Sequence, residues 1–365
     1  MYDVVIVGGG PAGATLARLI GKSRKVLVIE RRNMYRASEK EDYQKCCGGL
    51  IAPDAQKMLA EFGLGIPQHI LDGPQLFTVR TIDKKSNLER YYQRHYINVD
   101  RERFDRWLFS LIPSQVDVEC EAIFKGLEHT NNGVEITYVK DGRKRKAATK
   151  LLVGADGASS KVRRILSPDY PMPRQYIAIQ EYYRMDGEMP YYSSIFDKDI
   201  TDFYSWTIPK DGVLILGAAL HPEDDPVGKF VELKKRLRDR GFDFGPCIKR
   251  NGAYVSRPRK VGEILHGDGN IALIGEAAGW ISPSSAEGLS YCFRSALALS
   301  DAIEMDLNTS VAGYRKNTGK LRMNIRWKNI KAFLMYNDTI RFLIMKSGVL
   351  SMGSIKSKLA ESGIL

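Results

Sequence analysis

The sequence has only five cysteines, and their pattern fits neither a disulfide-stapled nor a metal-binding protein. They stand at Cys46, Cys47, Cys120, Cys247 and Cys292. An odd and irregularly spaced set argues against the disulfide framework of a small secreted domain. Because no C-x-x-C pair or His/Cys cluster has metal-ligand spacing, we predict no metal site. The five histidines are scattered along the chain, and none is a candidate catalytic base.

Long hydrophobic runs and a leader segment are also missing. No stretch of about 18 apolar residues is present, so we expect no transmembrane helix. The chain opens directly into an apolar strand, Tyr2–Gly8, without the basic and apolar regions of a secretory leader. We therefore predict a cytoplasmic protein. Its 365 residues, 44% hydrophobic and 27% charged, are typical of a globular chain of about two domains.

The first motif predicts dinucleotide binding. A strand at 3–7 leads into the turn Gly8–Gly13, a helix follows at 14–20, and a second strand at 25–29 ends in Glu30. This order of strand, glycine-rich turn, helix, strand and acid is typical of a fold that holds a pyrophosphate at the helix N-terminus and a ribose at the acid. The predicted contacts are Gly8, Gly10, Pro11, Ala12, Gly13, Glu30 and the adjacent Arg31.

Two later segments favour FAD over NAD. Residues 151–164 form a strand, a turn containing Asp156 and Gly157, and the start of a basic helix. Residues 270–288 form a strand, a small-residue turn with an acid, and a helix entry, which suits a ribityl chain and the flavin N1/O2 edge. Each segment taken alone also fits an ordinary strand-to-helix turn. The contacts predicted in the second segment are Gly275, Glu276, Gly279, Pro283 and Gly288.

The three segments together resemble the flavoproteins built like p-hydroxybenzoate hydroxylase. Their motifs here are GGGPAG, GADGASS and GEAAG followed by a proline and Glu-Gly. Ile97–Leu108 resembles the D-R-x-x-F-D-x-x-L helix of that group, and the resemblance implies that Arg101 approaches the flavin or its pyrophosphate.

Two further segments resemble the geranylgeranyl reductase family. Lys45–Gly49 is similar to its K-P-C-G-G stretch, and Phe203–Pro209 is similar to its Y-x-W-x-F-P motif. The resemblance covers about residues 1–310 and is nearest to a bacterial branch of FAD-binding oxidoreductases. The sequence departs from the family pattern at Cys46, Ile208 and Glu276, where the family has proline, phenylalanine and aspartate. The first two departures fall where the resemblance places the substrate.

The resemblance implies that Cys47 lies beside the isoalloxazine with Gly48 and Gly49, where its thiol would donate a proton. A vicinal disulfide with Cys46, or two half-buried thiols without chemistry, are the alternatives. Tyr204 and Trp206 alternate along a strand and therefore share one face. The resemblance makes that face a wall of the substrate cavity, and ordinary sheet core is the alternative. Cys47, Tyr204 and Trp206 are therefore the predicted catalytic residues.

The predicted fold is α/β, with a Rossmann-type FAD-binding domain, an inserted antiparallel-sheet substrate domain and a C-terminal helical region. The FAD-binding domain takes residues 1–64, 96–168 and 263–310, and the substrate domain takes 65–95 and 169–262. Strands are expected at 75–80, 176–183, 191–196, 203–208 and 213–219, with helical residues near 226–241 and a return segment at 251–262. Aromatic residues are dense in this sheet, which suits an apolar, unsaturated or aromatic ligand.

The leading functional hypothesis is an FAD-dependent oxidoreductase that reduces C=C bonds of an isoprenoid, a prenyl lipid or a similar apolar substrate. The alternative is a flavin-dependent monooxygenase or halogenase acting on an aromatic small molecule, because Tyr204–Pro209 is one aromatic away from the W-x-W-x-I-P motif of flavin halogenases. A non-catalytic flavin-binding protein is a third class. No second nucleotide-binding domain is visible, so NAD(P)H that docks transiently or a small electron-carrier protein would supply electrons.

The C-terminal residues 311–365 are poor in acids. Asp338 and Glu361 stand against eleven bases, and this region supplies most of the net charge of +12. The bases interleave with apolar residues, which is typical of helices that lie on anionic lipid. Helices packed on the rest of the protein with a solvated basic face are the alternative. We predict no nucleic-acid partner, because no binding motif accompanies the charge, and the sequence does not indicate an oligomeric state.

Overall fold

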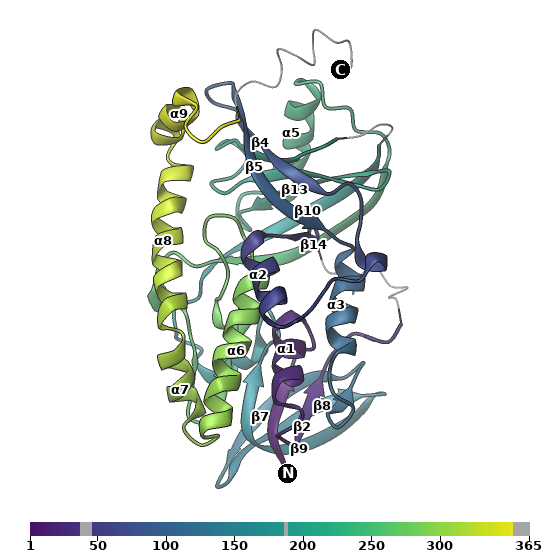
Figure 1. Cartoon of the computed structure of the whole chain (residues 1–365), viewed down its shortest axis with the longest axis vertical. Coiled ribbons are helices and arrows are strands. Elements are labelled where there is room, and N and C mark those ends of the chain that lie inside the picture. The colour runs from purple at the N-terminus through teal and green to yellow at the C-terminus, as the bar shows by residue number, and fades with distance from the viewer. Residues whose placement is uncertain (37–45, 186–188, 353–365) are drawn as a thin grey trace.

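The computed structural model describes residues 1–36, 46–185 and 189–352. Lys45 of the Lys45–Gly49 stretch, and Lys356, Lys358 and Glu361 of the basic C-terminal region, lie outside the described residues. Two eight-stranded sheets organise the chain. In Figure 1 the first sheet occupies the lower half and the second the upper half, and the yellow helix α8 runs along the left edge past both.

The first sheet carries the dinucleotide motif. Its strand order is β15-β16-β9-β1-β2-β6, with β7 and β8 attached to β9. β1 pairs in parallel with both β2 and β9, and its apolar residues are buried on both faces, as expected of a parallel strand covered on two sides. The strands are β1 (Tyr2–Val7), β2 (Val26–Ile29), β6 (Asp117–Glu119), β7 (Ile123–Thr130), β8 (Gly133–Lys140), β9 (Arg143–Gly154), β15 (Gly267–Asp268) and β16 (Ile271–Leu273).

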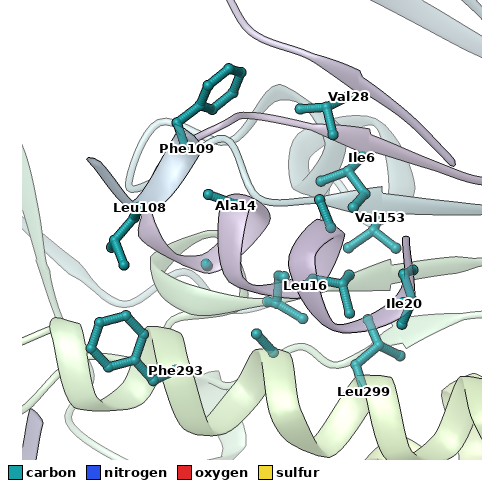
Figure 2. Close-up of a cluster of buried hydrophobic side chains, with 14 of the residues drawn as sticks. Ile6, Ala14, Leu16, Ile20, Val28, Leu108, Phe109, Val153, Phe293 and Leu299 are labelled. Carbon is teal, nitrogen blue, oxygen red and sulfur yellow. The ribbon is translucent and has the colours of Figure 1, made fainter. Parts of the chain in front are cut away.

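Helices cover one face of this sheet and place its glycine-rich turn. Helix α1 lies between the strands and α6: in Figure 2, Leu16 of α1 lies between Ile6, Val28 and Val153 of β1, β2 and β9 and Leu299 of α6. The burial of these side chains fixes α1 against the sheet, with its N-terminus near the end of β1. A cofactor phosphate would lie at that N-terminus. The helices on this face are α1 (Pro11–Ile20), α2 (Pro53–Glu61), α3 (Arg101–Ser110) and α6 (Leu289–Met305). Helix α4 (Lys161–Leu166) packs on the opposite face, and the chain also has short 3-10 turns η2 (Gln68–Ile70), η3 (Val261–Glu263) and η4 (Gly275–Ala278).

The second sheet has the order β14-β10-β13-β12-β11-β4-β5-β3. Its neighbours are antiparallel, except that β11 runs parallel to β4. The chain between these two strands passes through the first sheet, and a connection of that length permits a parallel partner. The strands are β3 (Leu50–Ile51), β4 (Leu76–Asp83), β5 (Leu88–Asn98), β10 (Arg174–Arg184), β11 (Tyr192–Phe196), β12 (Ser205–Lys210), β13 (Val213–Leu220) and β14 (Cys247–Arg257).

The two faces of the second sheet have different neighbours. Leu214 and Leu216 point to the face covered by α5 (Pro226–Arg238), where Phe230 and Leu233 are buried. Ile208 and Ile215 point to the opposite face, which meets the segment before α2. This second face, called here the inner face, is the one that carries the aromatic residues Tyr182, Tyr192 and Trp206.

The mixed α/β fold with a dinucleotide-binding first sheet confirms the predicted fold class. The structure draws the sheet boundary differently from the sequence, because β3 and the last residues of β5 pair within the second sheet. These residues fall inside the predicted segments 1–64 and 96–168. The two-residue strand β3 forms because it pairs with β5, and the local sequence does not predict this pairing.

Up to residue 352, where the described part of the chain ends, three helices follow α6: α7 (Ser310–Asn317), α8 (Gly319–Tyr336) and α9 (Asp338–Ser347). The first turns of α8 pack Leu321 and Ile325 into the core of the first sheet, whereas Met335 and Tyr336 pack against aromatic residues of the second sheet. None of the helices in the described ranges is long and apolar enough to cross a membrane.

Candidate active site

The glycines of the first turn are required by close backbone contacts. Gly8 has φ +107°, and a Cβ on it would lie 2.5 Å from the carbonyl oxygen of Ala155. A Cβ on Gly13 would lie 1.9 Å from the carbonyl oxygen of Gly8. These contacts bring α1 and the turn after β9 against the end of β1. The first and second predicted motifs therefore meet at one place.

The N-terminus of α1 has free space and unpaired donors. Gly10 precedes the helix without a side-chain cap, Pro11 occupies the first position, and the first turn holds no acidic residue. A Cβ on Gly10 would find no atom closer than Arg32 Nη2, at 4.0 Å. The first backbone N–H groups of a helix have no partner within it, so those of Ala12 and Gly13 are positioned to bind an anion. This geometry fits a pyrophosphate.

A charged network extends from this turn. Glu30 Oε2 accepts a hydrogen bond from the Gly9 N–H at 2.7 Å, and Oε1 accepts one from Arg32 Nε at 3.1 Å. Arg32 Nη1 also pairs with Asp105 Oδ2 at 3.4 Å. Arg31, the arginine predicted from the sequence, is exposed. Arg32 is therefore the arginine that the structure places beside the glycine-rich turn.

Arg101 joins this network to Cys47. Its Nε donates to Asp105 Oδ1 at 2.7 Å, and its Nη1 donates to Cys47 Sγ at 3.1 Å. Burial alone would lower the pKa of Arg101, but the adjacent Asp105 and Cys47 raise that pKa above its ordinary value. The guanidinium is therefore a fixed positive charge beside the sulfur. Two predicted residues that are 54 positions apart are in direct contact.

Asp156 organises the turn after β9. Its Oδ2 accepts hydrogen bonds from the N–H groups of Lys161 at 2.7 Å and Val162 at 3.2 Å, which caps α4. Burial raises the pKa of Asp156. Its Oδ1 is buried and has no hydrogen-bond partner among the described residues. Gly157 has φ +79° and open space beside it, so a ligand can approach the backbone here.

The third motif closes on the first. A Cβ on Gly275 would lie 2.9 Å from Ala12 Cβ, so the turn of η4 packs on the first turn of α1. Glu276 Oε1 accepts a hydrogen bond from the Ser256 N–H at 2.9 Å, which links this turn to β14. Gly279 ends η4 with φ +93°, and Gly288 precedes α6 without a side-chain cap.

Pro283 lies on the loop between these two glycines, and its carbonyl oxygen accepts a hydrogen bond from Arg257 Nε at 3.0 Å. This bond ties the loop to β14 of the second sheet. The uncapped N-terminus of α6 therefore starts from a loop anchored on both sheets, which suits a negative charge that develops on a cofactor there.

The Cys46–Gly49 segment lies against the inner face of the second sheet. A Cβ on Gly48 would lie 2.1 Å from Ile208 Cδ1. Cys46 Sγ lies 3.3 Å from Gln180 Oε1, so its thiol contacts β10 while Cys47 contacts Arg101 on α3. The two sulfurs have different partners and form no disulfide in this structure.

Lys210 was not predicted as a site residue, yet it is buried beside the same segment. Its Nζ donates to Asn98 Oδ1 and to the carbonyl oxygen of Val99, the latter at 2.8 Å, and lies 3.5 Å from Asp72 Oδ2. A Cβ on Gly49 would lie 2.7 Å from this Nζ. Burial lowers the pKa of Lys210. In the sequence it begins a Lys-Asp-Gly hairpin turn, which gives no indication of burial.

Tyr204 and Trp206 are held at the inner face by specific contacts. Tyr204 Oη donates to the carbonyl oxygen of Ser285 at 2.8 Å, and burial raises its pKa. The Trp206 ring lies over Gly217, where an added Cβ would meet indole atoms at 2.3 to 2.5 Å. The two rings are 5.4 Å apart between centroids. They form one continuous aromatic surface.

A row of buried polar atoms crosses this surface. The strand register aligns Asn251, Gln180, Gly217 and Trp206 across four neighbouring strands, so their side chains share a face. Gln180 is 1% exposed. Gln180 Nε2, Trp206 Nε1 and Asn251 Oδ1 are buried without a hydrogen-bond partner among the described residues. The row therefore offers two donors and one acceptor.

Comparison with known proteins identifies the fold and its cofactor. The pattern of the FAD binding domain family matches residues 1–216, more than half of the chain. The chain belongs to this family. The family is one of FAD-dependent oxidoreductases, and this supports FAD as the cofactor of the protein. Flavin-dependent proteins also stand among its structural neighbours.

Full-length similarity extends to a bacterial protein. The chain is 39% identical to Protein CbrA of Escherichia coli O9:H4 (strain HS) over 355 residues, which cover 97% of this chain and 96% of that protein. The protein is therefore also a member of the CbrA family.

Solved structures share the fold at lower identity. A geranylgeranyl bacteriochlorophyll reductase-like protein from Thermoplasma acidophilum superposes with a TM-score of 0.82 at 20% identity, covering 98% of this chain and 95% of that one. A flavin-dependent brominase superposes with a TM-score of 0.67 at 19% identity, covering 94% and 92%. The fold of the reductase-like protein covers both sheets of this chain.

Proposed function

We propose that the protein reduces C=C bonds of an isoprenoid, a prenyl lipid or a similar apolar substrate at the inner face of the second sheet. The observation that carries the proposal is the contact between the Cys46–Gly49 segment and β12. It puts a thiol, a guanidinium and an aromatic surface at one site. The fold shared with a geranylgeranyl bacteriochlorophyll reductase-like protein agrees with this reading.

Saturation of a double bond requires a hydride and a proton on neighbouring carbons. FAD, when bound and reduced, supplies the hydride. The Cys47 thiol supplies the proton, and the Arg101 guanidinium 3.1 Å from the sulfur stabilises the thiolate that remains. Solvent then returns the proton to the thiolate. Asp105 holds Arg101 in place through the 2.7 Å ion pair. NAD(P)H or a small electron-carrier protein would be the source of the electrons.

The buried polar row adds a feature to the proposed substrate. Gln180 Nε2 and Trp206 Nε1 are two uncharged donors next to an aromatic surface. A buried donor without a partner costs roughly 1 to 3 kcal/mol, so a ligand oxygen that accepts from both is favoured over a pure hydrocarbon. We therefore expect a substrate whose apolar chain packs on the aromatic surface and whose neutral hydroxyl or carbonyl oxygen accepts hydrogen bonds from the two donors.

The experiment compares Cys47→Ala with Cys247→Ala in the FAD-loaded protein. Cys247 is exposed on β14 and serves as the matched control. Purified protein, reduced anaerobically, is incubated with a lipid extract, and products are read by mass spectrometry. We expect a gain of two hydrogens for the wild type and for Cys247→Ala. Cys47→Ala should keep its flavin absorbance and turn over at least 10²-fold more slowly. Unchanged turnover would eliminate the thiol as proton donor.

A flavin-dependent halogenase or monooxygenase is the second candidate function. Tyr204, Trp206, Ile208 and Pro209 match the halogenase W-x-W-x-I-P motif at all but one aromatic position. The shared fold with a flavin-dependent brominase is compatible with this alternative. The same product assay separates the two under air with chloride or bromide present. Oxygen or halogen in the product, instead of two hydrogens, supports the second candidate.

A further inference from the structure

Helix α8 has two opposite apolar faces. Leu321, Ile325 and Ala332 form its buried face. The opposite side carries Met323, Trp327, Ile330 and Leu334, whose spacing of four, three and four residues places them in one row. Eleven residues separate the ends of this row, which is about 16 Å along a helix. We call these four residues, together with the adjacent Phe333, the outer stripe.

The outer stripe is exposed to an unusual degree for large apolar side chains. The exposed fractions are 48% for Met323, 64% for Trp327, 52% for Ile330, 65% for Phe333 and 38% for Leu334. A helix on the surface of a globular protein typically carries one apolar face, towards the core, and a polar face towards solvent, so a second apolar face on α8 is unusual. Within the described part of the chain nothing covers this face, and Figure 1 shows α8 at the edge of the molecule. A contiguous apolar surface of this kind marks an interaction site.

Positive charge flanks the stripe on both sides. Arg326 lies next to it on one side and Lys320 on the other, and both are exposed. Residues 310–337, which span α7 and α8, contain seven Lys and Arg and no Asp or Glu. A partner of this surface must therefore accept apolar side chains along a line and offer negative charge beside it.

We propose that the outer stripe docks on an anionic lipid bilayer, with α8 lying in the plane of the membrane surface. Met323, Ile330 and Leu334 would enter the acyl boundary, Trp327 would sit at the headgroup level where its ring is favoured, and the flanking bases would meet lipid phosphates. A second copy of the chain fits less well, because pairing two such faces brings their bases together with no acidic residue of α7 or α8 to balance them.

This surface is separate from the proposed reaction. The stripe lies on the side of α8 opposite Leu321 and Ile325, which pack into the core of the first sheet, and its five residues are exposed. Docking and turnover are therefore measured independently, and failure of one does not imply failure of the other.

The test is flotation of the FAD-loaded full chain with two kinds of vesicle, pure phosphatidylcholine and a three-to-one mixture of phosphatidylcholine with phosphatidylglycerol. The variants are Trp327→Ser/Phe333→Ser for the stripe and Lys320→Gln/Arg326→Gln for the charge. Val227→Ser/Val231→Ser is the matched control, because these two residues are each 52% exposed one turn apart on α5. Flavin absorbance reports that every variant is folded.

We expect the wild type and the α5 control to float with the anionic vesicles and to bind them at least tenfold more tightly than neutral ones. The stripe variant and the charge variant should each bind anionic vesicles at least tenfold more weakly than the wild type. Three results overturn the proposal: no flotation of the wild type, anionic binding that the stripe variant retains, or a concentration-dependent dimer that the stripe variant abolishes.

Discussion

The glycines at positions 10 and 13 make separable contributions, and one alanine substitution at each position tests them. A Cβ on Gly13 would lie 1.9 Å from the carbonyl oxygen of Gly8, and both groups belong to packed backbone. A carbon and an oxygen need more than 3 Å, so α1 has to move away from β1 by about 1 Å. Overpacking of this kind costs roughly 1 to 3 kcal/mol of unfolding free energy.

Gly10→Ala should behave differently. Gly10 has φ −69°, which alanine adopts without strain, and its nearest atom is Arg32 Nη2 at 4.0 Å. The apoprotein should therefore be as stable as the wild type. The added methyl fills the space through which a pyrophosphate reaches the first N–H groups of α1. Loss of one or two charge-assisted hydrogen bonds, about 1.5 to 3 kcal/mol each, weakens FAD binding by at least tenfold.

The assay combines urea unfolding of the apoproteins with FAD titration followed by flavin fluorescence. We expect Gly13→Ala to lower the unfolding free energy without FAD, and Gly10→Ala to lower FAD affinity alone. Wild-type FAD affinity in Gly10→Ala would refute the assignment of the phosphate site. Wild-type apoprotein stability in Gly13→Ala would refute the close packing of α1 on β1.

Two further predictions concern stability. Burial lowers the pKa of His266 to about 4, whereas the same side chain in the unfolded chain has a pKa near 6.5. The free energy of unfolding should therefore fall as the pH drops from about 6.5 towards 4, by about 2 kcal/mol at pH 5. Urea unfolding at pH 7.5 and at pH 5 measures this loss, and His266→Gln should remove it. Arg341→Met breaks a buried ion pair with Asp83, whose N···O distance is 2.8 Å, and should lower the free energy of unfolding by about 3 to 5 kcal/mol. Lys85→Met removes an exposed pair and should change the free energy of unfolding by less than about 0.5 kcal/mol. Equal effects of the two substitutions would contradict the buried pair.

The dinucleotide-binding half of the molecule was predictable because its information is local. The strand at 3–7, the glycine-rich turn and the helix behind it are adjacent in the chain, and each has a strong pattern of its own. The identity of the arginine was not predictable. Arg31 and Arg32 are neighbours in an irregular segment, and only the fold turns Arg32 towards Glu30.

Contacts between distant segments carry the rest of the site. The family resemblance predicted that Cys47 and Arg101 both lie near the cofactor, but the contact between the two side chains is visible only in the folded chain. Lys210 had no visible role, because a lysine at a hairpin turn is typically solvated. The partners of its ammonium group, Asn98 and Asp72, come from strand β5 and the loop before β4. Such partners are set by strand pairing, which the sequence pattern leaves open.

The order in which the strands of the two sheets occur along the chain limits when each sheet can form during synthesis. The first sheet pairs β1 with β9 and β9 with β16, and the second gathers strands from before and after β9. Neither sheet is encoded by one continuous stretch of residues. During translation, more than two thirds of the chain must leave the ribosome before either sheet has all its strands, and until then apolar strand edges are exposed to aggregation.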